Sequence, residues 1–305
     1  MDQDTTKDNV QNGSGDRASY VLGHVSAGTH RITVRAVRQE DPGSPLVVLL
    51  PAMGVPARYY RPFIADLHRQ GLAVVLFDLR GQGESRPRAA RGVRFGYQSL
   101  IDDVDAVLDL VESALPEAPR FLLGHSLGGQ IALLHTARHP NRVHGVALVA
   151  SGSVWFRSFP GVHKFRTLFV TQAVATVSAL LGYWPGERFG FGGRQATDLM
   201  HDWARQARTG RYRLNGSTTD YEAALRELRQ PLLTVSVAGD GLAPQSSVDH
   251  LAAKARRARR TAKHYTRSAS GAENLGHFEW VRNGGELSRW ISDWIASAHD
   301  SSVHA

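Results

Sequence analysis

The sequence predicts an α/β fold with a mostly parallel central sheet, helices on both faces of the sheet, and a small helical cap insertion. Short runs that are apolar at every position alternate along the chain with longer segments of helical periodicity. Continuous apolar runs are typical of parallel strands that helices cover on both faces. The alternation stops at Ser151 and resumes after residue 215, which indicates the insertion.

The first half of the chain provides strands and helices in alternating order. Residues 29–37 alternate apolar and polar side chains, as a half-exposed strand near a sheet edge does. Four buried strands follow, at 46–50, at 72–77, from Phe121 to the turn at Ser126, and at 143–149. Amphipathic helices separate these strands, with apolar residues at helical spacing over 59–67, over 100–111 and up to Pro140. This β-α-β order implies right-handed crossovers in a parallel sheet.

Residues 152–215 break the pattern. They are rich in aromatic residues, glycine and short helical runs, and no part of them is strand-like. A plain loop of this length is uncommon in a compact domain. We interpret the segment as a helical cap over the carboxyl-terminal edge of the sheet, where ligands bind in such folds. The alternative is an extra layer of the core.

The α/β pattern resumes after the insertion and completes the core. The expected elements are a helix over 221–228, a buried strand over 232–238, a helix over about 245–259, a short last strand over 263–267, and an amphipathic helix around 287–295. The chain is thus expected to comprise an N-terminal disordered tail (1–17), a core (18–151 and 216–298), the cap (152–215) and a C-terminal tail (299–305).

Composition excludes several classes of function. The N-terminal segment lacks the apolar region of a signal peptide, and no apolar run approaches the roughly 18 residues that cross a bilayer. We therefore expect a cytoplasmic protein without a membrane span. The chain contains no cysteine, which excludes thiol catalysis and disulfides. Its 14 histidines show no metal-ligand spacing with acidic or sulfur partners, so we expect no metal.

The chain is basic, with 36 Lys and Arg residues against 28 Asp and Glu residues and a net charge of +8. The densest basic run, 254–260, lies on the helix predicted over 245–259 and has no interleaved aromatic residue. We interpret this run as a solvated helix face. Binding of nucleic acid is therefore not expected, although the run leaves that alternative open to a test of salt dependence.

The most informative motif is Gly124-His125-Ser126-Leu127-Gly128, which has the G-x-S-x-G pattern of a nucleophile elbow. An apolar strand precedes it and a helical pattern follows it. The tight strand-to-helix turn strains the backbone at Ser126, so the residues two before and two after it must be very small. The motif predicts that Ser126 is a nucleophile. An ordinary serine in a glycine-rich turn is the alternative.

A serine nucleophile needs a base and a carboxylate that orients the base. Asp240 directly follows a buried strand, and His277 lies in the loop after the last strand. The order Ser126, Asp240, His277 is the order found in α/β hydrolases. Asp78 also ends a strand but precedes the serine, and we expect it to brace the loop around Arg80. Asp220 precedes its strand and is less well placed.

The oxyanion of a tetrahedral intermediate needs N–H donors. We expect one donor to be the backbone N–H of Leu127, directly after the nucleophile. The other should come from the loop after the 46–50 strand, and the Met53 N–H is the candidate chosen by position.

Several motifs together resemble the α/β-hydrolase superfamily over about residues 20–298. They are GHSLGG, FDLRGQGES, GDGLAP and LGHF, in that order along the chain. The segments PAMGVPARYYRPF, GYWPGERFGFGG and MHDWARQARTGRY resemble bacterial esterases of the serine aminopeptidase-like and monoglyceride lipase-like branch. Many superfamily members carry His-Gly where Pro51-Ala52 stands here.

The resemblance implies a serine hydrolase that uses no metal and no cofactor and acts on a small-molecule acyl substrate. The leading hypothesis is hydrolysis of a carboxylic ester through an acyl-enzyme on Ser126. Amide, peptide or thioester hydrolysis and acyl transfer remain open within the same fold. A relative that only binds a small ligand is a further alternative, although no triad residue is missing from the sequence.

Overall fold

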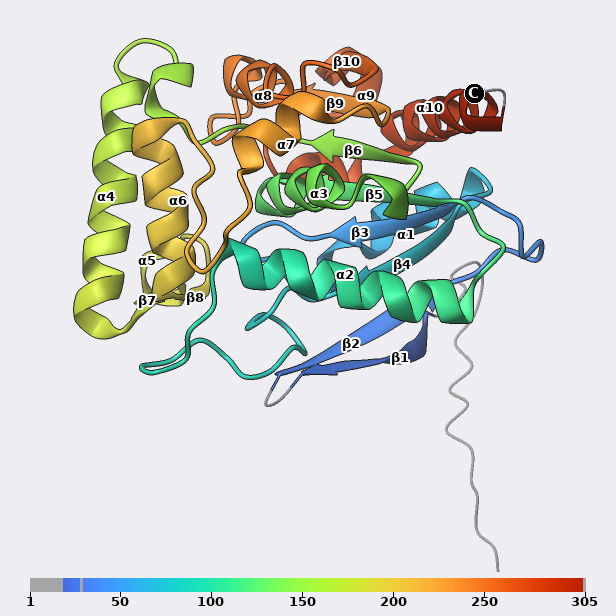
Figure 1. Ribbon diagram of the computed structural model, residues 1–305. Helices are drawn as coiled ribbons and strands as arrows, with labels where there is room; N and C mark the ends of the chain where they lie inside the picture. Colours follow the sequence, from blue (N-terminus) through green and yellow to red (C-terminus); the bar gives the residue numbers. More distant parts are fainter. Residues whose placement is uncertain (1–18, 28–29, 304–305) are drawn as a thin grey trace, which may run out of the picture.

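The computed structural model describes residues 19–27 and 30–303. Its main feature is an eight-stranded sheet in the order β1-β2-β4-β3-β5-β6-β9-β10. The strands are β1 (Tyr20–Ala27), β2 (His30–Val37), β3 (Leu46–Leu50), β4 (Ala73–Phe77), β5 (Arg120–His125), β6 (Gly145–Val149), β9 (Leu232–Val237) and β10 (Arg260–Tyr265). Pairing is antiparallel between β1 and β2 and between β2 and β4, and parallel from β4 to β10. The predicted fold class is confirmed (Figure 1).

Helices cover both faces of this sheet. The core helices are α1 (Arg61–Arg69), α2 (Tyr97–Ala114), α3 (Leu127–Arg138), α7 (Tyr221–Glu227), α8 (Gln245–Ala252), α9 (Arg267–Ser270) and α10 (Gly285–Val303). Short 3-10 helices lie at η1 (Ala57–Tyr60), η2 (Pro140–Arg142), η3 (Phe156–Ser158) and η4 (Glu279–Arg282). Helices α2 and α3 pack on one face, while α1 and α10 pack on the other.

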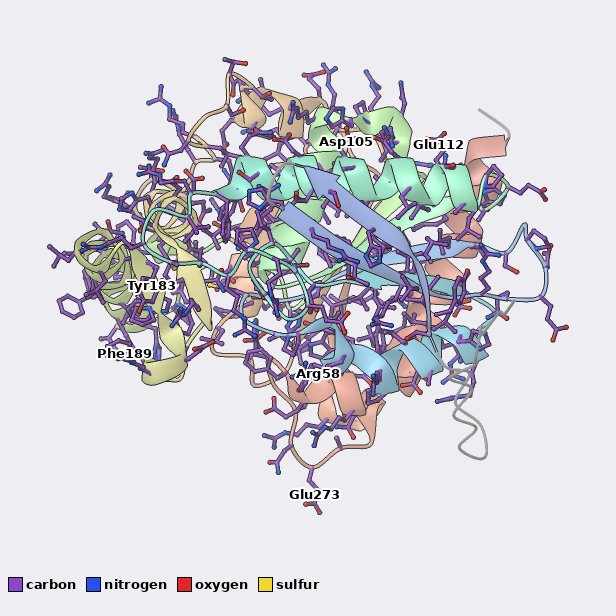
Figure 2. The ribbon with its side chains drawn as sticks, turned by 90° about the horizontal axis from the view of Figure 1, so that it is seen from below. Arg58, Asp105, Glu112, Tyr183, Phe189 and Glu273 are labelled. Atoms are coloured by element: carbon purple, nitrogen blue, oxygen red, sulfur yellow. The ribbon has the colours of Figure 1, made fainter. Side chains whose placement is uncertain are left out.

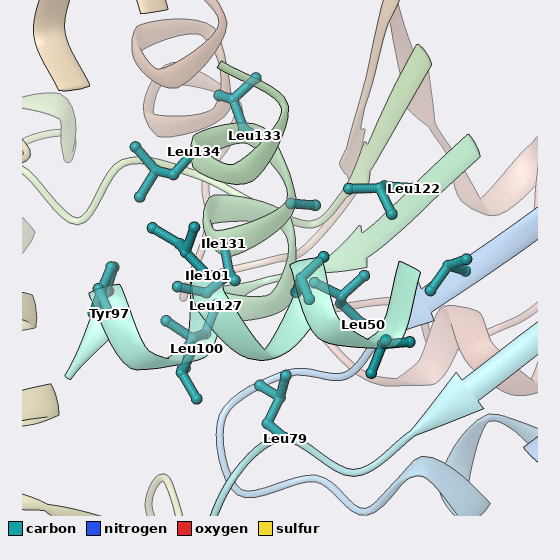
Figure 3. Packing of buried hydrophobic residues seen from close by; sticks show 14 of the residues in the cluster. Leu50, Leu79, Tyr97, Leu100, Ile101, Leu122, Leu127, Ile131, Leu133 and Leu134 are labelled. Carbon is teal, nitrogen blue, oxygen red and sulfur yellow. The ribbon is translucent and has the colours of Figure 1, made fainter. Parts of the chain in front are cut away.

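The packing of strand β3 explains why all five of its residues are apolar. Leu46, Val48 and Leu50 belong to the cluster under α2 and α3, whereas Val47 and Leu49 belong to the cluster under α1 and α10. Successive side chains of a strand point to opposite faces, and here both faces are buried. Figure 3 shows the first cluster, in which Leu50 lies near Leu127 at the start of α3.

The insertion, for which we keep the name cap, consists of α4 (His163–Leu181), α5 (Gly186–Phe189), α6 (Thr197–Thr209) and a two-stranded antiparallel sheet of β7 (Tyr183–Pro185) and β8 (Arg194–Ala196). The chain enters it after β6 and leaves it before α7, so it lies beyond the carboxyl ends of the parallel strands (left in Figure 1). The expectation that this segment holds no strand is wrong. Each strand has only three residues, too few to give a recognisable alternation in the sequence.

The structure adds one strand to the prediction and corrects the ends of three predicted elements, which are α8, β10 and α10. Strand β1 was not predicted, because Gly23 interrupts its alternation at a register shift. Helix α10 continues to Val303, so most of the expected 299–305 tail is helical. The expected tail at 1–17 lies outside the described residues.

The helix predicted over 245–259 ends as α8 at Ala252, and β10 begins at Arg260 rather than at residue 263. Residues 254–259 of the basic run therefore lie in turns and not on a helix face, and Arg260 is the first residue of β10. The Lys254 ammonium donates to Glu222 (2.9 Å) and to the Gly210 carbonyl (2.6 Å). Arg257 pairs with Glu227. These contacts hold the chain in turns where the local sequence alone favours a helix.

Candidate active site

Ser126 lies in the turn between β5 and α3, with φ 54° and ψ −118°. It is one of two non-glycine residues with positive φ in the part of the chain that the structure describes. The glycines around it are required by close packing. A methyl group on Gly124 would lie 2.2 Å from Gly129 Cα, and one on Gly128 would lie 2.3 Å from the Leu50 carbonyl oxygen. The motif thus folds as a sharp strand-to-helix turn.

The structure brings Asp240 and His277 together. The Nδ1 atom of His277 lies 2.8 Å from Asp240 Oδ2, and both side chains are buried. The second carboxylate oxygen of Asp240 accepts the N–H groups of Leu242 and Ala243, each at 2.8 Å. The carboxylate is therefore fixed in its turn after β9. With Nδ1–H donating to the carboxylate, the imidazole keeps a lone pair on Nε2.

Asp78 and Asp220 have other partners. Asp78 accepts the N–H groups of Ala57 (2.6 Å) and Glu84 (2.7 Å), so it braces the loop that contains Arg80. Asp220 caps α7 by accepting the Ala223 N–H at 3.0 Å. Asp240 is the only one of the three whose carboxylate has a hydrogen bond to His277.

The two candidate oxyanion donors lie in different settings. Leu127 is the first residue of α3, where N–H groups have no partner within the helix. Met53 lies in the turn after β3. Its neighbours are anchored, because the Ala52 N–H donates to Tyr60 Oη (2.9 Å) and the Gly54 N–H donates to Gln82 Oε1 (2.9 Å). Among the described residues, no hydrogen bond from the Met53 amide is present.

Sequence reasoning missed a second buried histidine in the site. His125 Nδ1 lies 2.7 Å from Tyr60 Oη, and the His125 and His277 rings lie 4.8 Å apart between centroids. Burial lowers the pKa of His125 well below its ordinary value, and the nearby His277 lowers it further. His125 is therefore neutral. Its position in the motif beside Ser126 was the one signal that could have marked it.

A cavity of about 370 Å³ lies away from these residues, between β2 and α1. Its lining includes the charged residues Arg35, Arg58, Arg61, Asp78 and Glu84 beside apolar residues such as Ile64 and Leu76. Figure 2 labels Arg58 beside α1. None of Ser126, Asp240 and His277 lines this cavity.

The described residues hold neither a metal-binding cluster nor a membrane-spanning helix. No cluster of three or more His, Cys, Asp or Glu side chains is placed to hold a metal ion there. No helix in the same residues has the length and apolar character needed to cross a membrane.

The parallel sheet, the elbow turn and the helices on both faces define an α/β hydrolase. A family model described as serine aminopeptidase, S33, matches residues 41–269, and the chain belongs to this family.

Two relatives match shorter segments of the chain. Monoglyceride lipase of Mus musculus is 32% identical over 81 residues, which is 27% of this chain and 27% of the mouse protein. Phospholipase YtpA of Bacillus subtilis is 38% identical over 90 residues, or 29% of this chain and 33% of that protein. The matches thus span about a third or less of these relatives' length.

A structural comparison extends over nearly the whole chain. A soluble variant of monoglyceride lipase from Saccharomyces cerevisiae, in complex with a substrate analogue, has a TM-score of 0.67. The sequences are 16% identical, and the alignment covers 92% of this chain and 95% of the yeast protein. At this identity the likeness establishes the fold.

Proposed function

We propose that this protein is a serine hydrolase that cleaves a carboxylic ester of a small or medium-sized substrate. The observation that carries the proposal is the buried His277–Asp240 hydrogen bond, in a fold whose elbow turn presents Ser126. Names of relatives support the choice of an ester, since the mouse relative is a monoglyceride lipase and the Bacillus relative a phospholipase.

In the proposed mechanism, His277 Nε2 takes the proton of Ser126 Oγ while the oxygen attacks the ester carbonyl carbon. Asp240 orients the imidazole through Nδ1 and stabilises the imidazolium that forms. The N–H groups of Leu127 and Met53 stabilise the oxyanion of the tetrahedral intermediate. Collapse of this intermediate breaks the ester C–O bond, and His277 gives its proton to the leaving alcohol.

The second half of the cycle releases the acyl group. A water molecule loses a proton to His277 Nε2 and attacks the acyl-enzyme carbonyl. The resulting intermediate breaks its bond to Ser126 Oγ, which regains the proton and frees the carboxylic acid. An amine or thiol leaving group would follow the same path, so amide, peptide and thioester hydrolysis are alternatives on the same residues. Replacement of water by an alcohol would give acyl transfer.

A panel of p-nitrophenyl esters, thioesters and aminoacyl anilides tests this proposal. We expect turnover of the esters and its loss in Ser126→Ala. Preference for the anilides would favour the peptidase alternative, which the family description supports. Absence of turnover with every member, by a protein that still binds acyl compounds, would favour the non-catalytic ligand-binding alternative and contradict the proposal.

A further inference from the structure

The glycine-rich loop of the cap packs directly against the turn that contains Met53. A methyl group on Gly54 would lie 2.4 Å from the carbonyl carbon of Gly192, and one on Gly193 would lie 3.0 Å from Gly54 Cα. Real Cβ atoms do not approach other atoms as closely as the first of these distances. The two backbones therefore touch. Gly54 has no room for a side chain at the contact, and a methyl group on Gly193 would require the Gly54 turn to shift by a few tenths of an ångström.

The same turn is anchored on its other sides by the core. Tyr60 Oη holds the Ala52 N–H, Gln82 Oε1 holds the Gly54 N–H, and the Val55 N–H donates to the Ala52 carbonyl at 3.1 Å. The amide of Met53 lies between the two anchored amides. Its direction is thus set by contacts to the core on one side and to the cap on the other.

The cap loop is itself well fixed. The Trp184 indole N–H donates to the Phe191 carbonyl (3.0 Å), and Gln195 Nε2 donates to the Gly192 carbonyl (2.6 Å). Trp184 and Gln195 are paired across β7 and β8 and are buried. Figure 2 labels Tyr183 and Phe189, which lie in the part of the cap leading into this loop. Because this loop is fixed, its contact with Gly54 holds the Met53 turn in one position.

We propose that Gly192 and Gly193 are positioning residues for the Met53 amide, so that the cap takes part in stabilising the oxyanion. This inference rests on the proposed function, in which the Met53 N–H is an oxyanion donor. Loss of one such donor lowers kcat by about 100- to 1000-fold, and small misplacements of reacting groups cost a large part of that effect. A shift of the turn should therefore reduce kcat without weakening ground-state binding.

The test compares Gly193→Ala with Gly190→Ala. Both residues lie in the same loop and have positive φ, +59° and +65°, so an alanine suffers similar backbone strain at each. They differ in surroundings, because a methyl group on Gly190 would have nothing within 4 Å.

For Gly193→Ala we expect kcat for a p-nitrophenyl acetate substrate to fall about tenfold or more, with KM within about twofold of wild type. Affinity for a trifluoromethyl ketone, whose adduct carries an oxyanion, should fall in parallel. Gly190→Ala should keep kcat within about twofold of wild type. Equal kcat values for the two variants at equal melting temperature would overturn the inference.

A second pair of variants covers the case in which Gly193→Ala does not fold. In Gly192→Ala the new methyl group would lie 3.0 Å from Met53 Sδ. Met53→Ala removes that sulfur and keeps the amide. We expect Gly192→Ala to lower kcat in the wild-type background and to have a smaller effect in the Met53→Ala background. Equal effects in both backgrounds would contradict the inference.

Ser126→Ala separates this inference from the proposed function. If Ser126→Ala keeps its esterase activity, the proposed function fails and the positioning role fails with it. If Ser126→Ala is inactive and the glycine variants match their controls, only the positioning role fails.

Discussion

Ser126 combines a strained backbone with a position at the end of a buried strand. A positive φ in a residue with a side chain costs on the order of 1–3 kcal/mol and persists where the surroundings enforce it. Here the surroundings are the two backbone contacts at Gly124 and Gly128. We predict that a fluorophosphonate probe adds one label to the wild-type protein and none to Ser126→Ala, as measured by intact mass. A label that remains in the variant would place the nucleophile elsewhere.

Asp240 is predicted to orient His277 rather than to take its proton. Asp240→Asn should leave the fold intact, because an amide has nearly the same shape, and should lower kcat by roughly three to four decades by favouring the wrong imidazole tautomer. The comparison variants are Asp78→Asn and Asp220→Asn, which remove carboxylates bound to other groups. A larger loss of kcat in either of these variants, with Asp240→Asn active, would assign the acid to another residue.

The contact between Tyr60 and His125 could not be predicted from the sequence. The elbow could be predicted because sterics dictate its glycines, and the order of Asp240 and His277 follows from the fold. Tyr60 and His125 are 65 residues apart. Tyr60 lies in a segment that the sequence predicts as an amphipathic helix, and His125 lies in the elbow motif. No local periodicity marks such a pair. The same holds for the contact of Gly54 with Gly192.

Helix α6 carries a buried carboxylate that joins the cap to the core. Asp202 accepts the N–H of Tyr97 at the start of α2 (3.1 Å) and that of Asn215, the last residue of the cap (3.0 Å). Burial raises its pKa from 3.8 to about 6, against the opposing effect of the two N–H donors. Since the pKa is higher in the folded state, the folded protein gains stability from the protonated form. This gain is complete below about pH 4 and is lost as the pH rises through about 6.

We therefore predict that wild type loses stability relative to Asp202→Asn as the pH rises. Asparagine cannot ionise, so it lacks this pH-dependent contribution. Between pH 5 and pH 7.5 the difference in free energy of unfolding should change by about 1–2 kcal/mol in favour of the variant. Urea unfolding of both proteins at the two pH values measures it. Parallel pH profiles would show that Asp202 does not titrate in this range.

The end of α5 and the loop after it offer a matched pair of aromatic residues for substrate selection. Phe191 is partly buried against the core cluster to which Met53 also packs, whereas Phe189 is 62% exposed. Each acyl methylene buried against the cap should add up to about 0.8 kcal/mol, or roughly fourfold in kcat/KM. We expect kcat/KM to rise from acetyl to hexanoyl esters, with the chain-length limit shifted in Phe191→Ala and unchanged in Phe189→Ala. Superimposable profiles for all three proteins would exclude a role for Phe191 in the acyl site.

Long-range contacts also explain why element ends were harder to predict than elements. Strand β3 is predictable because each of its residues is buried in one of two clusters. Helix α8 ends two residues before Lys254, whose ammonium group donates to Glu222 of α7. Strands β7 and β8 are stabilised by pairing with each other, and each is too short to show the alternation of apolar and polar residues that marks a strand. Hydrophobic periodicity reports on burial, and it carries no information on these specific partners.

At the scale of the whole molecule, the cap and the core share one hydrophobic cluster. Cap residues Leu199, Met200 and Trp203 belong to the same buried cluster as Leu100 and Ile131 of the core. Lys254 of the core donates to the Gly210 carbonyl at the end of the cap. A cap built this way lacks a separate core of its own, so it should not unfold independently.

We therefore predict one cooperative thermal transition, with equal calorimetric and van't Hoff enthalpies. Trp203→Ala, which removes a buried cap side chain, should cost about 3–5 kcal/mol and lower the temperature of that single transition. The surface variant Phe169→Ala, which removes a cap side chain that is 75% exposed, is the control and should leave the transition temperature nearly unchanged. Calorimetry of the three proteins measures both quantities. A Trp203→Ala trace that splits into two transitions would mean that the cap folds apart from the sheet, and that its contact with the Met53 turn can open while the core remains folded.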